Sequence, residues 1–126
     1  MKLGALTFLV SDYDEAIAWF TGRLGFVLTA DTELGGGKRW VTVTPPGGGT
    51  ALLLAKAIGS QSAAIGSQGG GRVFLFLHSD DFARDHAAMQ AKGVAFLEAP
   101  RREAYGTVAV FEDLYGNKWD LIAHAN

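Results

Sequence analysis

Few side chains in this sequence combine the type and the spacing that chemistry requires. Asp120 lies between Trp119 and Leu121 in an apolar run of strand length. An apolar environment raises the pKa of a carboxyl group, so Asp120 is a candidate catalytic acid or base. The alternative is that Asp120 pairs with a neighbouring basic or hydroxyl group and only orients its strand. Lys118, two residues away on the same face, is then the expected partner.

Other reactive sets cannot be assembled from the sequence. His78, His86 and His124 include no pair spaced i, i+4, so we expect surface or helix-packing roles and no joint histidine site. There is no cysteine, which excludes a disulfide framework, a thiol nucleophile and a thiolate metal site. The glycine-rich stretches lack a phosphate-loop pattern, and neither a Ser-His-Asp set nor a carboxylate pair can be placed.

The composition is that of one globular domain. The chain has 126 residues, 48% of them hydrophobic, which is enough for a sizeable core. A net charge of −2 without a Lys or Arg cluster argues against nucleic-acid and membrane-surface partners. No apolar stretch approaches the length of a membrane span, and the start MKLGALTFLV lacks a signal-peptide cleavage pattern. We therefore expect a cytoplasmic protein.

The elements that must position these side chains occur twice. The segment Phe8-Leu9-x-Ser11-Asp12 returns 68 residues later as Phe76-Leu77-x-Ser79-Asp80, and the same offset, without a gap, relates Gly25 to Gly93. A period this long, present twice, indicates paired supersecondary modules and not a solenoid. We predict modules at 1–57 and 72–126 with one site between them. The glycine-rich stretch 58–71 is predicted to be a flexible linker or a mobile flap.

Each module is predicted to run strand, helix, strand, strand, strand. In the first module the strands are 3–10, 26–31, 38–44 and 50–55, and in the second they are 72–77, 95–98, 107–112 and 118–123. Tyr13, Ile17, Phe20 and Leu24 recur at helical spacing and Gly25 ends that helix. The second helix, 82–92, is predicted to be capped by Asp80.

Period-two alternation assigns the faces of the first strand in each module. Leu6, Phe8 and Val10 should lie under the first helix, and their repeat partners Phe74, Phe76 and His78 under the second. The opposite face then carries Ala5, Thr7 and Leu9 in one module and Val73, Leu75 and Leu77 in the other. If the sheets curl, this second face is the inside of a cup.

Three segments of the chain form a recognisable series: DYDEAIAWFTGRLGFVL, then GGGKRWVTVTPPGGGTALLL, then HSDDFARDHAAMQAKGVAFLEAPRREAYGTVAVFEDLYGNKWDLI. Together they resemble the vicinal oxygen chelate superfamily, which includes glyoxalase I, extradiol dioxygenases, fosfomycin-resistance thiol transferases and bleomycin-resistance proteins. The resemblance implies an α+β fold in which two βαβββ modules form a cupped mixed sheet. It also implies a homodimer.

In the enzymes of that family a metal lies at the bottom of the cup, held by His and Glu side chains from the first and last strand of each module. The resemblance maps these positions to Ala5, Leu52, Val73 and Asp120. Only Asp120 can donate to a metal, whereas a catalytic site needs about three protein ligands. We therefore predict no metal and no cofactor.

The predicted function is metal-independent binding of a small, partly apolar molecule in the cup. Trp40 can stack on a flat ligand, unless it packs in the core or a dimer interface. Arg102 and Tyr105 could meet an anionic or phenolic ligand, unless they form a solvated loop. The full predicted lining is Thr7, Leu9, Trp40, Thr42, Leu54, Leu75, Arg102, Tyr105, Val108, Val110, Lys118 and Ile122, with Asp120 as the candidate catalytic residue. The alternatives are a metal-dependent or Asp120-assisted lyase, isomerase or dioxygenase, and a dimeric scaffold with a filled cup.

Overall fold

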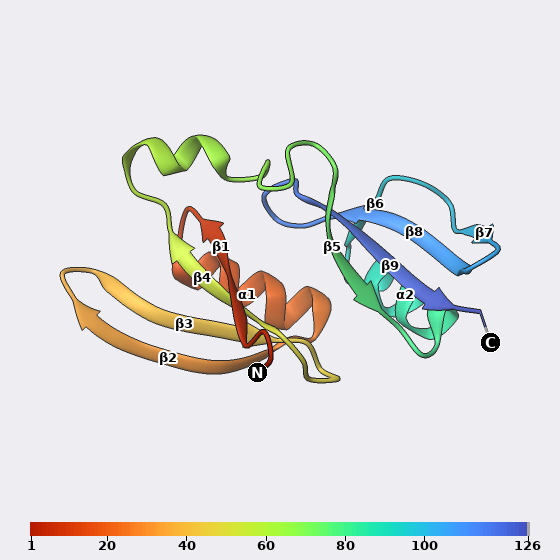
Figure 1. Cartoon of the computed structure of the whole chain (residues 1–126), viewed down its shortest axis with the longest axis horizontal. Helices are drawn as coiled ribbons and strands as arrows, with labels where there is room; N and C mark the ends of the chain where they lie inside the picture. The colour runs from red at the N-terminus through yellow and green to blue at the C-terminus, as the bar shows by residue number, and fades with distance from the viewer. Residues whose placement is uncertain (126) are drawn as a thin grey trace. The chain divides into compact units, whose positions relative to one another are not determined.

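The computed structural model describes residues 1–125, which fall into two compact units, Met1–Ile65 (unit 1) and the chain from Gly66 onward (unit 2). Unit 1 contains β1 (Ala5–Val10), α1 (Tyr13–Leu24), β2 (Val27–Gly35), β3 (Lys38–Thr44), β4 (Ala51–Lys56) and the 3₁₀ helix η1 (Gly59–Ala64). Unit 2 contains β5 (Val73–His78), α2 (Phe82–Ala91), β6 (Ala95–Phe96), β7 (Arg101–Glu103), β8 (Gly106–Glu112) and β9 (Lys118–His124). Figure 1 shows a sheet and a helix in each unit.

The two sheets have the same strand order. Unit 1 is arranged β1-β4-β3-β2 and unit 2 β5-β9-β8-β6, with β7 also paired to β8. In each sheet the first and last strands of the module run parallel, and the other neighbours are antiparallel. The prediction of an α+β fold built from two similar βαβββ modules is confirmed.

Helix α1 begins and ends where its end residues satisfy the backbone. The Asp12 carboxylate accepts a hydrogen bond from the Glu15 N–H at 2.8 Å, and Gly25 ends the helix in the left-handed conformation, φ 69°. The buried stripe is Tyr13, Ala16, Phe20 and Leu24, so Ala16 takes the place predicted for Ile17. This stripe covers one face of the unit 1 sheet, where the ring of Phe20 contacts that of Phe8 at 5.3 Å between centroids.

Helix α2 covers its sheet through a chain of aromatic contacts. The imidazole of His86 lies against the rings of Phe82 and Phe96, at 5.3 and 4.4 Å between centroids, as the helix-packing role predicts. Phe96 contacts Phe111, which in turn stacks on Trp119, each pair at 5.6 Å. Such pairs each add about 0.5–1.5 kcal/mol beyond their buried area. They identify the sheet face with Phe111 and Trp119 as the one beneath α2.

The cap of α2 is one residue later than predicted. Asp81, and not Asp80, accepts the hydrogen bond from the Arg84 N–H at 3.1 Å. Because Asp12 caps α1, the offset between the two caps is 69 residues and not 68. The 68-residue repeat therefore does not hold without a gap: the start of the second helix lies one residue later than the repeat predicts.

The stretch 58–71, predicted as a flexible linker or flap, forms defined contacts with the rest of the chain. Its first half forms η1, and Gln68 donates its backbone N–H to Asn117 Oδ1 at 3.2 Å. A Cβ at Gly66 would collide with the carbonyl oxygen of Tyr115, so glycine allows the chain to pass close to the β8–β9 turn. None of the helices within residues 1–125 is long and apolar enough to cross a membrane.

Candidate functional site

Strand pairing in unit 2 defines the sheet face that no helix covers, which we call the helix-free face. Val110 lies opposite Asp120 and Val108 opposite Ile122 across the antiparallel β8–β9 pair. Paired residues point to the same side of a sheet and neighbours along a strand to opposite sides. Since Trp119 faces α2, these four side chains lie on the helix-free face. The predicted positions of Val108, Val110, Asp120 and Ile122 agree with this arrangement.

Strand β5 departs from the predicted faces because it contains a bulge. Val73 pairs with Lys118, but Leu75 pairs with Trp119, so one extra residue lies between them. After this bulge Leu75 is on the side of Trp119, and Phe76 is on the side of Asp120. Leu75 was predicted on the ligand side and Phe76 beneath the helix, and the bulge reverses both assignments. Phe76 is accordingly 59% exposed.

In unit 1 the side chains of β1 lie on the predicted faces, but Leu54 of β4 does not. Leu54 pairs with Phe8 and with Val41, and none of these three side chains is exposed. It is therefore part of the core beneath α1 and is removed from the predicted lining. Thr7 pairs with Leu53, which in turn pairs with Thr42. These three residues, with Leu9 beside them on β1, belong to the helix-free face of unit 1.

Trp40 and Thr42 occupy the same face of β3 in different ways. Trp40 is 47% exposed, so it is not a core residue of the chain. Thr42 is buried, and its hydroxyl is 2.7 Å from the Thr29 hydroxyl of β2. The Thr29 hydroxyl also lies 3.0 Å from that of Thr44. Trp40 is thus available for contact, whereas the Thr42 hydroxyl already has a partner.

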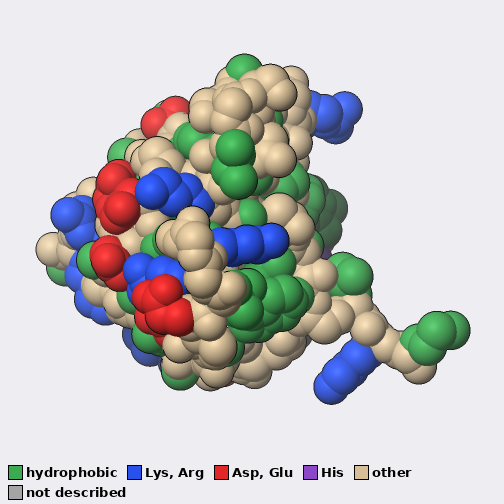
Figure 2. Space-filling model, turned by 90° about the vertical axis from the view of Figure 1, so that its left-hand side faces the viewer, with side chains coloured by type: hydrophobic (Ala, Val, Ile, Leu, Met, Phe, Trp, Pro, Cys, Tyr) green, Lys and Arg blue, Asp and Glu red, His purple; other side chains and the backbone are tan. Residues whose placement is uncertain are grey.

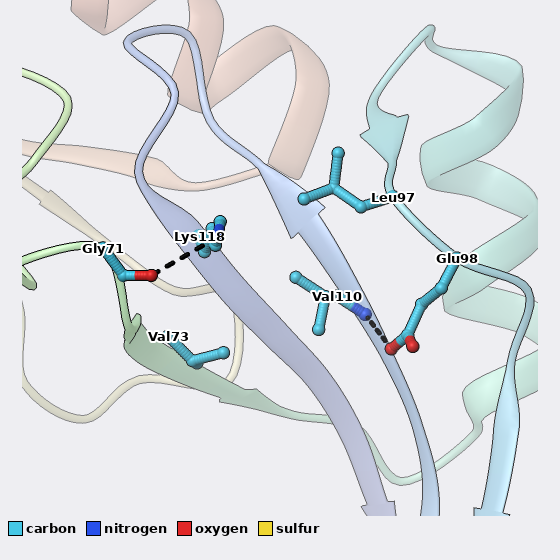
Figure 3. Close-up of a pocket in the computed structure, with 6 residues that line it drawn as sticks. All are labelled: Gly71, Val73, Leu97, Glu98, Val110 and Lys118. Carbon is cyan, nitrogen blue, oxygen red and sulfur yellow. Dashed lines mark hydrogen bonds between the residues drawn. The ribbon is translucent and has the colours of Figure 1, made fainter.

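A pocket of about 320 Å³ opens in unit 2 (Figure 3). It is lined by Gly71, Val73, Leu97, Glu98, Val110 and Lys118. Glu98 accepts a hydrogen bond from the Val110 N–H at 3.0 Å, and Lys118 Nζ donates to the carbonyl oxygen of Gly71 at 3.3 Å. An apolar floor with a few polar groups is typical of small-molecule sites.

The pocket lies where the outer strand of unit 2 is interrupted. The unbroken β2 of unit 1 corresponds, at the 68-residue offset, to β6 and β7 together. Between them the Glu98 carboxylate accepts from the Val110 N–H, as a strand carbonyl would, and Pro100 has no N–H to offer. Arg101 fixes Glu98 by an ion pair of 2.8 Å and holds Glu103 by another of 2.6 Å.

Asp120 lies on the same face as this pocket, paired with Val110. Its Oδ1 atom is buried and has no hydrogen-bond partner among the described residues. Burial raises the pKa of the Asp120 carboxyl, the nearby Arg101 guanidinium lowers it, and the Glu98 carboxylate adds to the rise. The partner predicted from the sequence, Lys118, instead bonds the Gly71 carbonyl.

The segment predicted as a loop bordering the site forms a hairpin. Arg102 is exposed in β7 opposite Thr107, and Tyr105 is 50% exposed at the turn. Neither lines the pocket, whereas their neighbour Arg101 interacts with both Glu98 and Asp120. Sequence reasoning missed Leu97, Glu98 and Arg101. The available signals were Pro100, which lies between β6 and β7, and the Glu98-x-x-Arg101 spacing.

Two of the three histidines do come together. The rings of His78 and His124 meet edge to face, at 4.8 Å between centroids, at the ends of β5 and β9. This contact was not expected from the sequence spacing because it joins parallel strands distant in the chain. Within residues 1–125, however, no group of three or more His, Asp or Glu side chains could hold a metal ion.

Comparison with known proteins identifies the family. The model of the Glyoxalase/Bleomycin resistance protein/Dioxygenase superfamily matches residues 2–121. This chain belongs to that superfamily. An uncharacterized protein of Shewanella frigidimarina is 53% identical over 120 residues, covering 93% of this chain and 89% of that protein. The uncharacterized protein YurT of Bacillus subtilis is 31% identical, covering 97% of this chain and 98% of its own length.

Solved structures of similar proteins share the fold. TnmS3, an antibiotic binding protein from Streptomyces sp. CB03234, is 30% identical with a TM-score of 0.82, covering 99% of this chain and 97% of its own. A superfamily member from Sphaerobacter thermophilus, 24% identical over 98% of each chain, matches with a TM-score of 0.77. The predicted glyoxalase-like fold is therefore confirmed.

The positions at which glyoxalase-superfamily enzymes bind metal do not fit a metal in this chain. The sequence mapped them to Ala5, Leu52, Val73 and Asp120. Leu52 pairs with Val43 beneath α1, so Leu53 is the residue of β4 on the helix-free face. Leu53 therefore takes the place of Leu52, and three of the four positions still have side chains without an atom that can bind a metal. A single carboxylate is too few for a stable divalent site.

Proposed function

We propose that this superfamily member binds a small, partly apolar molecule without the help of a metal ion. The observation that carries the proposal is the 320 Å³ pocket on the sheet of unit 2, with Val73, Leu97 and Val110 beside charged side chains. The similarity of the chain, along 99% of its length, to the antibiotic binding protein TnmS3 supports binding as the function. The absence of a donor side chain at three of the superfamily's four metal positions supports independence from metal.

The proposed contacts come from the helix-free faces. In unit 2 they include the apolar pocket residues, with Glu98, Lys118 and Asp120 as polar groups. In unit 1 we propose Trp40 as the aromatic contact, because it is the large ring left exposed on β3. The remaining predicted contacts that we retain are Thr7 and Leu9. Thr42, Val108 and Ile122 lie on the helix-free faces but are buried there, so they support the site without being proposed as direct contacts.

Acid–base catalysis by Asp120 is a second candidate function. Its support is the buried, unpartnered Oδ1 atom and the pKa raised by burial. A catalyst of this kind usually works beside a second reactive group. The carboxylate that acts on the charge of Asp120, Glu98, is occupied by Arg101 and by the Val110 N–H, which hold the pKa of Glu98 below the usual value. We therefore favour binding.

A ligand screen tests the proposal. Protein treated with EDTA and freed of metal should show raised melting temperatures with members of a library of small planar and partly apolar compounds. At a ligand concentration of 100 times the dissociation constant, the expected stabilisation is about 2.7 kcal/mol. The proposal is contradicted if no compound stabilises the metal-free protein, or if stabilisation returns only when a divalent metal is added back.

We also propose a homodimer. Trp40, Phe76 and Leu97 are each about half exposed, and each sheet has outer strands that no strand covers within residues 1–125. A symmetric pair can cover such surfaces, and two-fold pairing is the commonest oligomeric state. Light scattering at micromolar concentration should give twice the mass of the chain. A monomer mass over that range would contradict the proposal.

A further inference from the structure

We propose that the ligand of this site carries a protonated amine and that Asp120 receives it. The inference rests on the proposed binding function and deepens it by naming the chemical class of the ligand. It follows from the hydrogen-bonding state of one carboxylate, from the charges around it and from the apolar wall beside it.

Asp120 does not line the pocket itself, but it pairs with the lining residue Val110 on the same sheet face and has unused bonding capacity. Its Oδ1 atom is buried and unpartnered among the described residues. Both oxygens of Glu98 are already engaged, one by Arg101 and the other by the Val110 N–H. A buried carboxylate oxygen without a donor costs free energy, about 1–3 kcal/mol. That atom is itself closed to solvent, but the Asp120 side chain is only partly buried, so a ligand N–H or O–H donor at the other oxygen would stabilise the same carboxylate.

The charges on this face favour a cation over an anion. The acidic groups are Asp120, Glu98, Glu103 on β7, and Glu112, which pairs with Lys118 across β8–β9. Arg101 is shared between Glu98 and Glu103, and Lys118 Nζ is bonded to the Gly71 carbonyl. Four carboxyl groups against these two cations leave the face negative. An anionic ligand would be repelled there, whereas an ammonium group would be attracted.

The rest of the ligand must be apolar. Val73, Leu97 and Val110 form the wall of the pocket, as Figure 3 shows. Apolar surface buried there contributes roughly 25 cal/mol per Å². The site therefore fits an amine attached to a flat or aliphatic body, and it discriminates against a carboxylate on the same body.

Three indoles that differ only in their terminal group test the inference. Tryptamine carries an ammonium, indole-3-ethanol a neutral hydroxyl and indole-3-acetate a carboxylate on the same ring. Calorimetry at pH 7 should give tryptamine the highest affinity, about tenfold above indole-3-ethanol, because a charge-assisted hydrogen bond is roughly twice as strong as a neutral one. Indole-3-acetate should bind most weakly.

Asp120→Asn identifies the responsible group. The variant keeps the shape of the side chain and removes its charge, so tryptamine should lose its advantage over indole-3-ethanol. Glu15→Gln is the matched control, since it removes the same charge from an exposed position on α1, and it should leave the order of the three affinities unchanged. If Asp120→Asn does not fold, the order measured with the native chain still decides.

The outcomes separate this inference from the function on which it rests. Equal affinities, a preference for indole-3-acetate, or an amine preference that survives in Asp120→Asn overturns the inference. Failure of all three indoles to bind overturns it as well. If library compounds still stabilise the metal-free protein in those cases, the proposed binding function stands. If no compound does, the function itself is wrong.

Discussion

Replacing Asp113 with alanine should lower the free energy of unfolding by about 3 kcal/mol, the largest stability loss we expect for a polar residue in this chain. The Asp113 carboxylate is buried and accepts from the indole N–H of Trp119 at 2.8 Å and from the backbone N–H of Tyr115 at 2.9 Å. It also accepts from the backbone and side chain of Asn117, each at 3.1 Å. Alanine leaves these donors without their acceptor.

The substitution should also loosen the candidate site, because the hydrogen bonds to Asp113 join the end of β8 to the start of β9. These two strands carry Val110 and Asp120. Burial raises the pKa of the Asp113 carboxyl, and the hydrogen bonds from Trp119, Tyr115 and Asn117 oppose that rise. Urea denaturation at fixed protein concentration measures the effect. Glu112→Ala, at the preceding position of β8, is the control and should change stability by less than about 1 kcal/mol. Equal losses in the two variants would show that the buried bonds do not carry the stability.

Trp40→Ala should weaken the binding of a planar ligand by about tenfold and leave the stability of the chain nearly unchanged. Stacking on an aromatic ring contributes about 0.5–1.5 kcal/mol beyond burial, and about 1.4 kcal/mol corresponds to one decade in affinity. Because Trp40 is 47% exposed, its removal leaves no buried cavity within the chain. The dissociation constant of a compound found in the ligand screen and the melting temperature should be measured on the same preparation.

Two comparisons make the Trp40 result specific. Trp40→Phe keeps an aromatic ring and should retain most of the affinity. Leu34→Ala removes another exposed apolar side chain, 52% exposed near the end of the β2–β3 hairpin, and should leave affinity unchanged. A large loss of stability with intact affinity would instead place Trp40 in a structural role, such as the dimer interface.

Much of the fold could be predicted because its signals are local. The spacing of Tyr13, Phe20 and Leu24 with Gly25 after them identified α1, and runs of strand length between turn residues identified most strands. The repeat predicted the common strand order of the two units. Figure 2 shows acidic and basic side chains side by side on one face. In unit 1, Arg39 forms ion pairs with both Asp14 and Asp31.

The candidate site was less predictable because sheet faces depend on single-residue register. The bulge between Val73 and Leu75 moved the second half of β5 to the opposite face. The 68-residue offset from unit 1 would pair Ala109 of β8 with Ile122 of β9, but Ala109 pairs with Leu121, one residue earlier. A shift of one residue moves every side chain of a strand to the other face. Leu54, Leu75 and Leu52 were misassigned for this reason. The position of Glu98 depends on a hydrogen bond from the Val110 N–H of β8 to the Glu98 side chain, and the periodicity of a sequence does not reveal such a bond.

The interruption between β6 and β7 also changes what the outer edge of the unit 2 sheet can offer to a strand of another chain. Strand addition needs a continuous row of free backbone donors and acceptors along an outer edge. The unit 1 sheet ends in β2, nine residues long, whereas in unit 2 the corresponding edge is divided into pieces of two and three residues. An added strand can therefore dock along β2 but finds only fragments along the corresponding edge of the unit 2 sheet. The same break that opens a pocket protects that edge from templated growth.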